Sequence, residues 1–68
     1  MEKVLENVHD KIRKFRIDKG ISILKLSVDS GISRSHLYYI ETKKVSPSIE
    51  TLYKIAKSLD IELVDFFK

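Results

Sequence analysis

The chain has 68 residues, which is near the lower limit for a domain that folds unaided, and we expect a single domain over residues 1–68. It contains no cysteine, so it has no disulfide framework and no cysteine-based zinc site; its two histidines, His9 and His36, are too far apart to suggest a local metal pair. Thirteen Lys and Arg against ten Asp and Glu give a formal net charge of +3, which favours an anionic partner without establishing one.

No apolar stretch approaches the ~20 residues that span a bilayer. The charged N-terminal segment lacks the continuous apolar run of a secretory signal. We therefore expect a cytoplasmic protein with no membrane partner.

The first helix is predicted over residues 2–18. Apolar residues recur at steps of three and four and form one stripe: Leu5, Val8, Ile12 and Phe15. Basic residues cover much of the remaining surface. Lys19 and Gly20 then supply a C-terminal stop with favourable charge.

A second, very short helix is expected to begin after Ser22, whose side chain can cap it, and to run to about Ser30. Gly31 follows, where a sharp turn can use the tolerance of glycine for positive φ. Ser33 is the expected cap of a third helix over 34–42, with Leu37 and Ile40 on its inner edge.

Residues 43–47 are expected to form a loop. Ser48 can cap a fourth helix, and Glu50 in its first turn suits the helix dipole. The predicted buried stripe of this helix is Ile49, Leu52, Ile55, Ala56 and Leu59. After a break at 60–61, residues 62–67 are expected to form a last helical turn or two. The predicted fold is an all-α domain of five short helices.

The segment from Ser22 to Glu41 carries the functional signal. It is predicted to form a helix, a tight turn at Gly31 and a second helix packed across the first, with Leu26 and Ile32 expected to be buried between them. Ser27 is small where the two helices must approach closely. This combination is the sequence form of a helix-turn-helix.

The chain resembles the lambda-repressor and Cro-like helix-turn-helix proteins, the XRE family, from Ile12 to Phe67. The matching segments are IRKFRIDKGIS, the pair Leu26-Ser27, GISRSHL, the pair Ile40-Glu41 and PSIETLYKIAKSLDI. The resemblance implies a five-helix bundle whose third helix lies in the DNA major groove. It also implies a sequence-specific, double-stranded-DNA-binding transcriptional regulator, with a repressor favoured.

Mapped onto this sequence, the resemblance places base contacts at Arg34, Ser35, His36 and Tyr39. Arg34 can bond guanine O6 and N7 together, which is worth ~1–3 kcal/mol of discrimination. Three of these residues keep an alternative: a phosphate contact for Arg34, a plain surface position for His36, and packing at the edge of the bundle for Tyr39.

Phosphate contacts are expected around the start of the second helix, whose N-terminal amides form an anion site, and in the loop after the third helix. The residues are Ser22, Ile23, Ser33, Tyr38, Lys43 and Lys44. Tyr38 has packing as its alternative role, and the two lysines have the alternative of an ordinary solvated pair.

Arg16 and Glu41 match residues that form an ion pair in the resembling family. This pair is expected to tie the first helix to the end of the third without contacting a base.

Two such domains on a twofold axis would read half-sites ~34 Å apart, so a homodimer on a palindromic operator is expected. The favoured interface is the apolar C-terminus, with part of the fourth helix: Ile61, Leu63, Val64, Phe66 and Phe67. The same residues have a second explanation, since they can close the core of a single domain.

The sequence also departs from the family pattern. Ile23 stands where the family often has a phosphate-binding glutamine, Lys43 replaces a frequent glycine, and Leu24 and Val28 are apolar where polar residues are usual. Apolar residues on the second helix support an alternative function, a protein-binding module such as an antitoxin or adaptor. No catalytic constellation, metal set or phosphate-binding glycine loop is present, so no enzyme activity, cofactor or metal is expected.

Overall fold

The computed structural model describes the backbone of residues 2–68 and the side chains of residues 8–68. Its elements, in chain order, are α1 (Glu2–Asp18), α2 (Ile23–Ser30), α3 (Arg34–Glu41), α4 (Ile49–Ser58) and the 3-10 helix η1 (Leu63–Phe67). The all-α prediction is confirmed over this part of the chain. The prediction of five α-helices is wrong, because the last element has only five residues and adopts the tighter 3-10 form common in short helical pieces.

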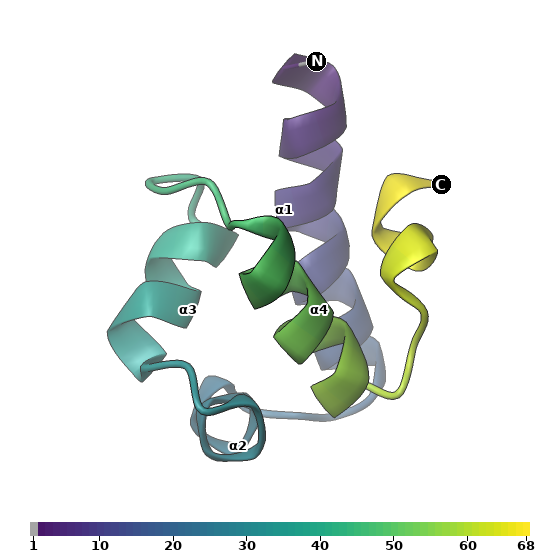
Figure 1. Cartoon of the computed structure of the whole chain (residues 1–68). Helices are drawn as coiled ribbons and strands as arrows, with labels where there is room; N and C mark the ends of the chain where they lie inside the picture. Colours follow the sequence, from purple (N-terminus) through teal and green to yellow (C-terminus); the bar gives the residue numbers. More distant parts are fainter. Residues whose placement is uncertain (1) are drawn as a thin grey trace.

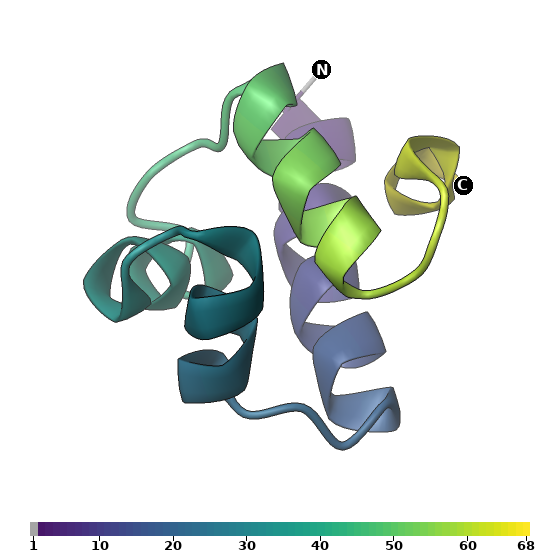
Figure 2. The same ribbon diagram turned by 60° about the horizontal axis from the view of Figure 1, so that its bottom comes forward.

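The helices pack around α1, which runs along the long axis of the domain (Figure 1). The helix α4 crosses in front of α1 in this view, α2 and α3 lie to one side, and η1 lies on the other side, an arrangement that the rotated view also shows (Figure 2). The helix α1 contacts both α3 and η1, whereas α2 contacts α3 and α4. The long first helix therefore links the two ends of the fold.

Serine caps define where three helices begin, as the sequence predicted. The hydroxyl oxygen of each cap accepts a hydrogen bond from the backbone N–H three residues later: Ser22 from Lys25 at 3.0 Å, Ser33 from His36 at 3.1 Å and Ser48 from Thr51 at 3.1 Å. Each bond satisfies one of the amides that a helix leaves unpaired at its first turn.

The core contains residues from every helix of the fold. Its buried apolar members are Val8, Ile12, Leu26, Ile32, Leu37, Ile40, Leu52, Ile55, Ala56, Leu59 and Phe66. Phe15 packs edge-to-face on Phe66, with ring centres 6.0 Å apart. The predicted stripe of α1 is thus confirmed for Val8 and Ile12, with Phe15 half-buried beside them, whereas Leu5 lies outside the described side chains.

Two details of the prediction are wrong. Ile49 is 64% exposed instead of buried, because it occupies the first residue of α4 at the edge of the apolar stripe. The helix α3 ends at Glu41, and Thr42 is its C-cap instead of its last residue.

The C-terminal residues divide between the two roles that the sequence left open. Phe66 is fully buried and closes the core of the domain itself, so its placement in a dimer interface is wrong. Ile61 and Leu63 are partly buried against the core, whereas Val64 and Phe67 are 56% and 45% exposed.

Candidate nucleic-acid interface

The helices α2 and α3 are joined by a turn that begins at Gly31. Gly31 adopts φ 77°, in the left-handed region that glycine enters without steric cost, and its N–H donates to the Ser27 carbonyl at 2.9 Å. Buried Leu26 and Ile32 then lie in the same core as Leu37 and Ile40. The geometry is that of a helix, a tight turn and a second helix.

The four residues predicted to contact bases all lie exposed on α3. Arg34, Ser35 and His36 form its first turn and Tyr39 lies one turn later, while Leu37 between them points into the core. Arg34, Ser35 and Tyr39 line one outward groove, whereas His36 is exposed outside its lining. Tyr39 is 45% exposed, so it is not buried in the core of the bundle and remains accessible to a ligand.

A groove of about 400 Å³ lies between the start of α2 and the exposed face of α3. Its lining consists of Ile23, Arg34, Ser35, Tyr38 and Tyr39. The rings of Tyr38 and Tyr39 meet edge-to-face, with centres 6.1 Å apart. Ile23 and Tyr38, predicted to contact phosphate, thus share a surface with three of the predicted base-contacting residues.

The expected phosphate-contacting residues fall into two groups. At the start of α2, the Ser22 hydroxyl is occupied as a cap, and at the start of α3 the Ser33 hydroxyl has the same role. After α3, the side chains of Lys43 and Lys44 are exposed in the loop. Lys43 Nζ lies 3.5 Å from Asp10 Oδ2, a solvent-exposed ion pair across 33 residues.

Lys43 adopts φ 66°, in the left-handed region that favours glycine. In the family that the sequence resembles, this position is frequently glycine. The left-handed backbone conformation accounts for that preference. The Lys43 N–H donates to the Ile40 carbonyl at 3.1 Å, which holds the tight turn after α3.

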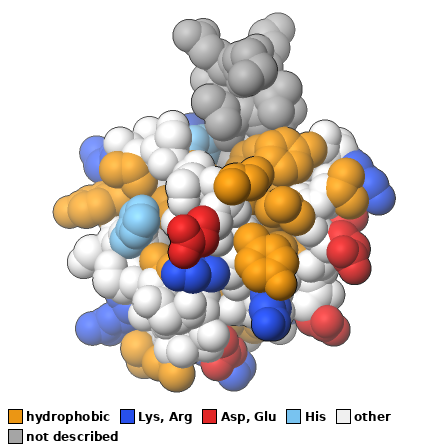
Figure 3. Space-filling view, in the orientation of Figure 1, with side chains coloured by type: hydrophobic (Ala, Val, Ile, Leu, Met, Phe, Trp, Pro, Cys, Tyr) orange, Lys and Arg blue, Asp and Glu red, His pale blue; other side chains and the backbone are white. Residues whose placement is uncertain are grey.

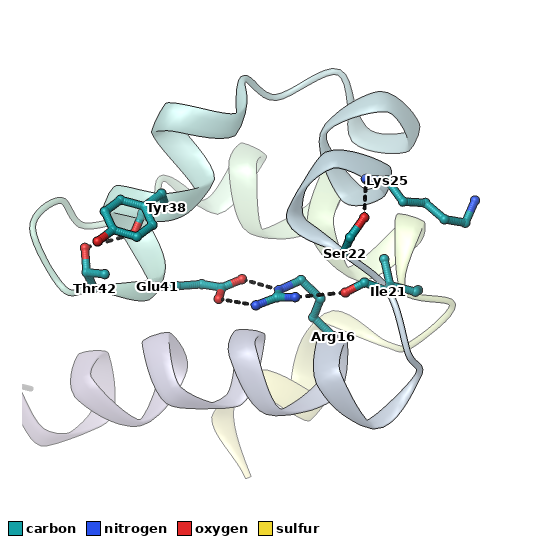
Figure 4. Close-up of polar contacts among 7 residues, drawn as sticks. All are labelled: Arg16, Ile21, Ser22, Lys25, Tyr38, Glu41 and Thr42. Atoms are coloured by element: carbon teal, nitrogen blue, oxygen red, sulfur yellow. Dashed lines mark hydrogen bonds and ion pairs between the residues drawn. The ribbon is translucent and has the colours of Figure 1, made fainter.

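The ion pair between Arg16 and Glu41 is confirmed (Figure 4). Arg16 Nε donates to Glu41 Oε2 at 2.7 Å and Arg16 Nη2 donates to Oε1 at 2.8 Å, a bidentate arrangement. Arg16 Nη1 donates to the Ile21 carbonyl at 2.8 Å, so the guanidinium also holds the segment that precedes α2. The hydrogen bonds that Arg16 donates to the Glu41 carboxylate raise the pKa of Arg16 above its ordinary value.

His9 makes a contact that the sequence did not predict. Its Nδ1 lies 2.7 Å from the carbonyl oxygen of Ile40 in a hydrogen bond across 31 residues, and the side chain is 5% exposed. The position of His9 in the sequence could have predicted this contact. His9 follows Val8, next to the apolar stripe of the first helix, and a polar residue that is buried there must find a hydrogen-bond partner.

The surface of α2 carries the apolar residues that motivated the protein-binding alternative. Leu24 and Val28 are 54% and 73% exposed, and they lie one helical turn apart. Lys25 and Asp29 form an exposed ion pair at 3.1 Å on the same helix.

The described part of the chain lacks two other features, a metal site and a membrane-spanning helix. No group of three or more His, Cys, Asp or Glu there has the geometry to hold a metal ion. None of its helices has both the length and the apolar character that crossing a membrane requires.

These features define a class: a helix-turn-helix domain whose second helix presents a polar and aromatic surface to solvent. The sequence profile of the helix-turn-helix family matches residues 12–66. The chain belongs to this family, in its lambda-repressor and Cro-like (XRE) branch.

Curated relatives include transcriptional regulators of bacteria and archaea. The chain is 42% identical over 57 residues to the HTH-type transcriptional regulator SlrR of Bacillus subtilis, covering 82% of this chain and 38% of SlrR. It is 32% identical over 57 residues to an uncharacterized HTH-type transcriptional regulator of Archaeoglobus fulgidus, covering 84% of this chain and 81% of that protein. The chain thus spans well under half of SlrR.

Solved structures agree on the fold. The restriction-modification controller protein C.AhdI from Aeromonas hydrophila superimposes with a TM-score of 0.88 at 28% identity, covering 98% of this chain and 100% of that one. A chain of the SinR protein/SinI protein complex superimposes with a TM-score of 0.83 at 29% identity, covering 90% and 60%.

Proposed function

We propose that this domain binds double-stranded DNA sequence-specifically and regulates transcription, with a repressor as the favoured kind. The observation that carries the proposal is the contrast between the two ends of α3. Its first turn exposes side chains that can form hydrogen bonds, and its C-terminal end is bonded to His9 and Arg16 of α1. An exposed helix held in this way fits the major groove, where the N-terminal residues of a recognition helix meet base edges. Family membership and relatives such as SlrR support the same function.

Within the interface, Arg34 is proposed to bond guanine, with Ser35 and His36 beside it on the first turn. The groove next to them has an isoleucine and two tyrosines in its lining, and apolar contact in the major groove selects the 5-methyl group of thymine. We therefore propose that Tyr39 and Ile23 contact a thymine methyl, a base-reading role for Ile23 in addition to the expected phosphate contact of its amide.

Phosphates on either side of the groove are proposed to meet two regions. The first is the N-terminus of α2 with Ser22 and Ile23, together with the Ser33 and Tyr38 side of α3, where backbone amides and hydroxyls favour an anion. The second is the loop that carries Lys43 and Lys44. Each lysine that pairs with a phosphate adds roughly one unit to the salt dependence of binding.

A homodimer on a palindromic operator, acting in the cytoplasm, completes the proposal. Supporting it, exposed apolar side chains lie on α4 and η1, and Figure 3 shows hydrophobic side chains gathered on this side of the molecule. The residues are Ile49, Tyr53, Val64 and Phe67. None of these residues belongs to α3, so a dimer formed through them would leave the exposed surface of α3 free for DNA.

The function is tested by selection from a library of random duplexes at low salt, with the Arg34→Ala variant run in parallel. Enrichment of a two-half-site sequence by the wild type, and its loss or relaxation in the variant, is the expected result. A folded wild-type sample that enriches no sequence would refute the proposal. Sedimentation at increasing concentration tests the dimer, with Phe67→Ser as the interface variant and Val45→Ser in the loop as a control.

A protein-binding module remains the second candidate function, because Leu24 and Val28 expose apolar surface on α2. The two functions use different residues. Combined substitution of Arg34 and Tyr39 by alanine should abolish DNA binding under the first proposal, while leaving partner binding through α2 intact under the second.

A further inference from the structure

Two residues of α1 bond to the last two residues of α3. His9 and Arg16 are seven residues apart, so they lie on the same face of α1 two turns from one another. His9 bonds to the backbone carbonyl of Ile40, and Arg16 bonds to the carboxylate of Glu41. Nothing in the resemblance to the family assigned a role to His9.

The two attachments differ in kind. Glu41 reaches Arg16 through rotatable side-chain bonds, so this ion pair tolerates small changes in the direction of α3. The Ile40 carbonyl belongs to the helix backbone and follows the helix axis. The bond from His9 therefore restrains the direction of α3 in a way that the ion pair alone does not.

We propose that His9 is a positioning residue for DNA recognition: its Nδ1–H fixes the direction of α3 through the Ile40 carbonyl. This inference rests on the proposed function. The same carbonyl accepts the N–H of Lys43 at 3.1 Å, so the bond also links α1 to the loop that carries the proposed phosphate-contacting lysines.

The geometry gives this restraint a measurable consequence. Arg34 lies six residues from Ile40, or roughly 9 Å along the helix at 1.5 Å per residue. A 10° change in the direction of α3 about Ile40 moves the Arg34 backbone by about 1.6 Å, whereas hydrogen bonds occupy a distance range of about 0.5 Å. Specific base contacts are therefore sensitive to this bond, while non-specific attraction to phosphates is not.

Two substitutions separate positioning from packing. His9→Leu fills the buried site without a donor. His9→Asn carries an amide nitrogen on Cγ, where histidine carries Nδ1, so it can restore the donor.

The first measurement is the orientation of α3 relative to α1, from residual dipolar couplings of the free protein. The expected result is a changed orientation in His9→Leu and a wild-type orientation in His9→Asn. Unchanged couplings in folded His9→Leu overturn the inference whether or not the protein binds DNA. Should His9→Leu not fold, His9→Gln replaces it, because its amide lies one carbon further from the backbone.

The second measurement is the ratio of affinities for the selected site and for an unrelated duplex, at a temperature where each variant is fully folded. We expect His9→Leu to lower this ratio about tenfold, the size of one lost base contact, and His9→Asn to restore most of it. Equal loss on both duplexes, or equal loss in both variants, contradicts a positioning role. A wild type with no preferred site refutes the proposed function, while the couplings still decide the restraint on α3.

Discussion

The two ends of α3 have opposite environments although the whole helix is only eight residues long. At its N-terminal end, Ser33, Arg34 and His36 are exposed. At its C-terminal end, Ile40 and Glu41 are buried and bonded to α1. The sequence of one short helix thus supplies both a surface with unsatisfied hydrogen-bonding capacity and a fixed attachment.

This contrast shows how a domain of this size can present a rigid reading surface. Side chains that bind a ligand must remain accessible, so they cannot be the ones that hold the helix. The attachment is instead placed at the far end, where a buried ion pair and a buried histidine are shielded from solvent. We therefore expect substitutions at the C-terminal end to change stability and to affect recognition only through the direction of α3, and those at the N-terminal end to change recognition directly.

The largest expected effect is at the fixed end. Glu41→Gln leaves Arg16, whose side chain is 12% exposed, without its charged partner, and the cost should approach the ~3–5 kcal/mol of breaking a fully buried pair. Urea denaturation measures the loss. Asp29→Asn, which breaks the exposed pair with Lys25, is the matched control and should change the free energy of unfolding by less than about 1 kcal/mol. Equal effects of the two changes would remove the contrast.

At the exposed end, Arg34→Ala should weaken binding to the selected operator by ~1–3 kcal/mol and relax the preference at one base pair per half-site. The free energy of unfolding should change by no more than about 0.5 kcal/mol, since the side chain is exposed. Titration with duplexes altered at single positions measures the preference. A uniform loss across all sequences would instead assign Arg34 to a phosphate.

Ser33 sharpens the comparison, because it belongs to the exposed end and yet caps the helix. Ser33→Ala should lower the free energy of unfolding by ~1 kcal/mol through loss of the bond to the His36 N–H. Thermal denaturation of Ser35→Ala provides the control, since Ser35 is exposed and lies inside the helix. Comparable losses in the two variants would show that capping does not distinguish them.

Lys44 tests the loop that follows the fixed end. Lys44→Gln should reduce the slope of log affinity against log salt by about one if this lysine pairs with a phosphate. Lys57→Gln on α4 should leave the slope unchanged, because Lys57 is exposed away from the proposed interface. Fluorescence anisotropy at several salt concentrations measures both slopes, and equal slopes would identify Lys44 as merely solvated.

The smallest effect is expected in η1, away from both ends of α3. The Glu62 N–H and then Lys68 lower the pKa of Asp65 below its ordinary value of 3.8. Asp65 therefore contributes stability at pH values above about 4, and this contribution is lost as the pH falls below that value. Acid titration of stability should be slightly shallower in Asp65→Asn than in the wild type, and identical curves would contradict the assignment.

The local structure was largely predictable because its causes are local. A serine three residues before an available amide marks a helix start, and the three serine caps begin helices as expected. The pairing of Arg16 with Glu41 was predictable only through the family resemblance, since 25 residues separate them.

The errors arise where tertiary packing decides. Periodicity places Ile49 near the apolar face of α4, but it does not show whether another element reaches the first turn, and none buries it there. His9 was missed because a histidine beside an apolar stripe can bond to any carbonyl that the fold brings to it. The 3-10 form of η1 was missed because apolar periodicity does not distinguish a 3-10 helix from an α-helix over five residues.

The conformation of Lys43 has a consequence for how this loop can vary. A side chain in the left-handed region carries a steric cost of roughly 1–2 kcal/mol that glycine avoids. A change of this residue to glycine would relieve that strain and at the same time remove a positive charge beside the recognition helix. At this position, glycine would favour a more stable fold, whereas lysine favours tighter contact with an anion.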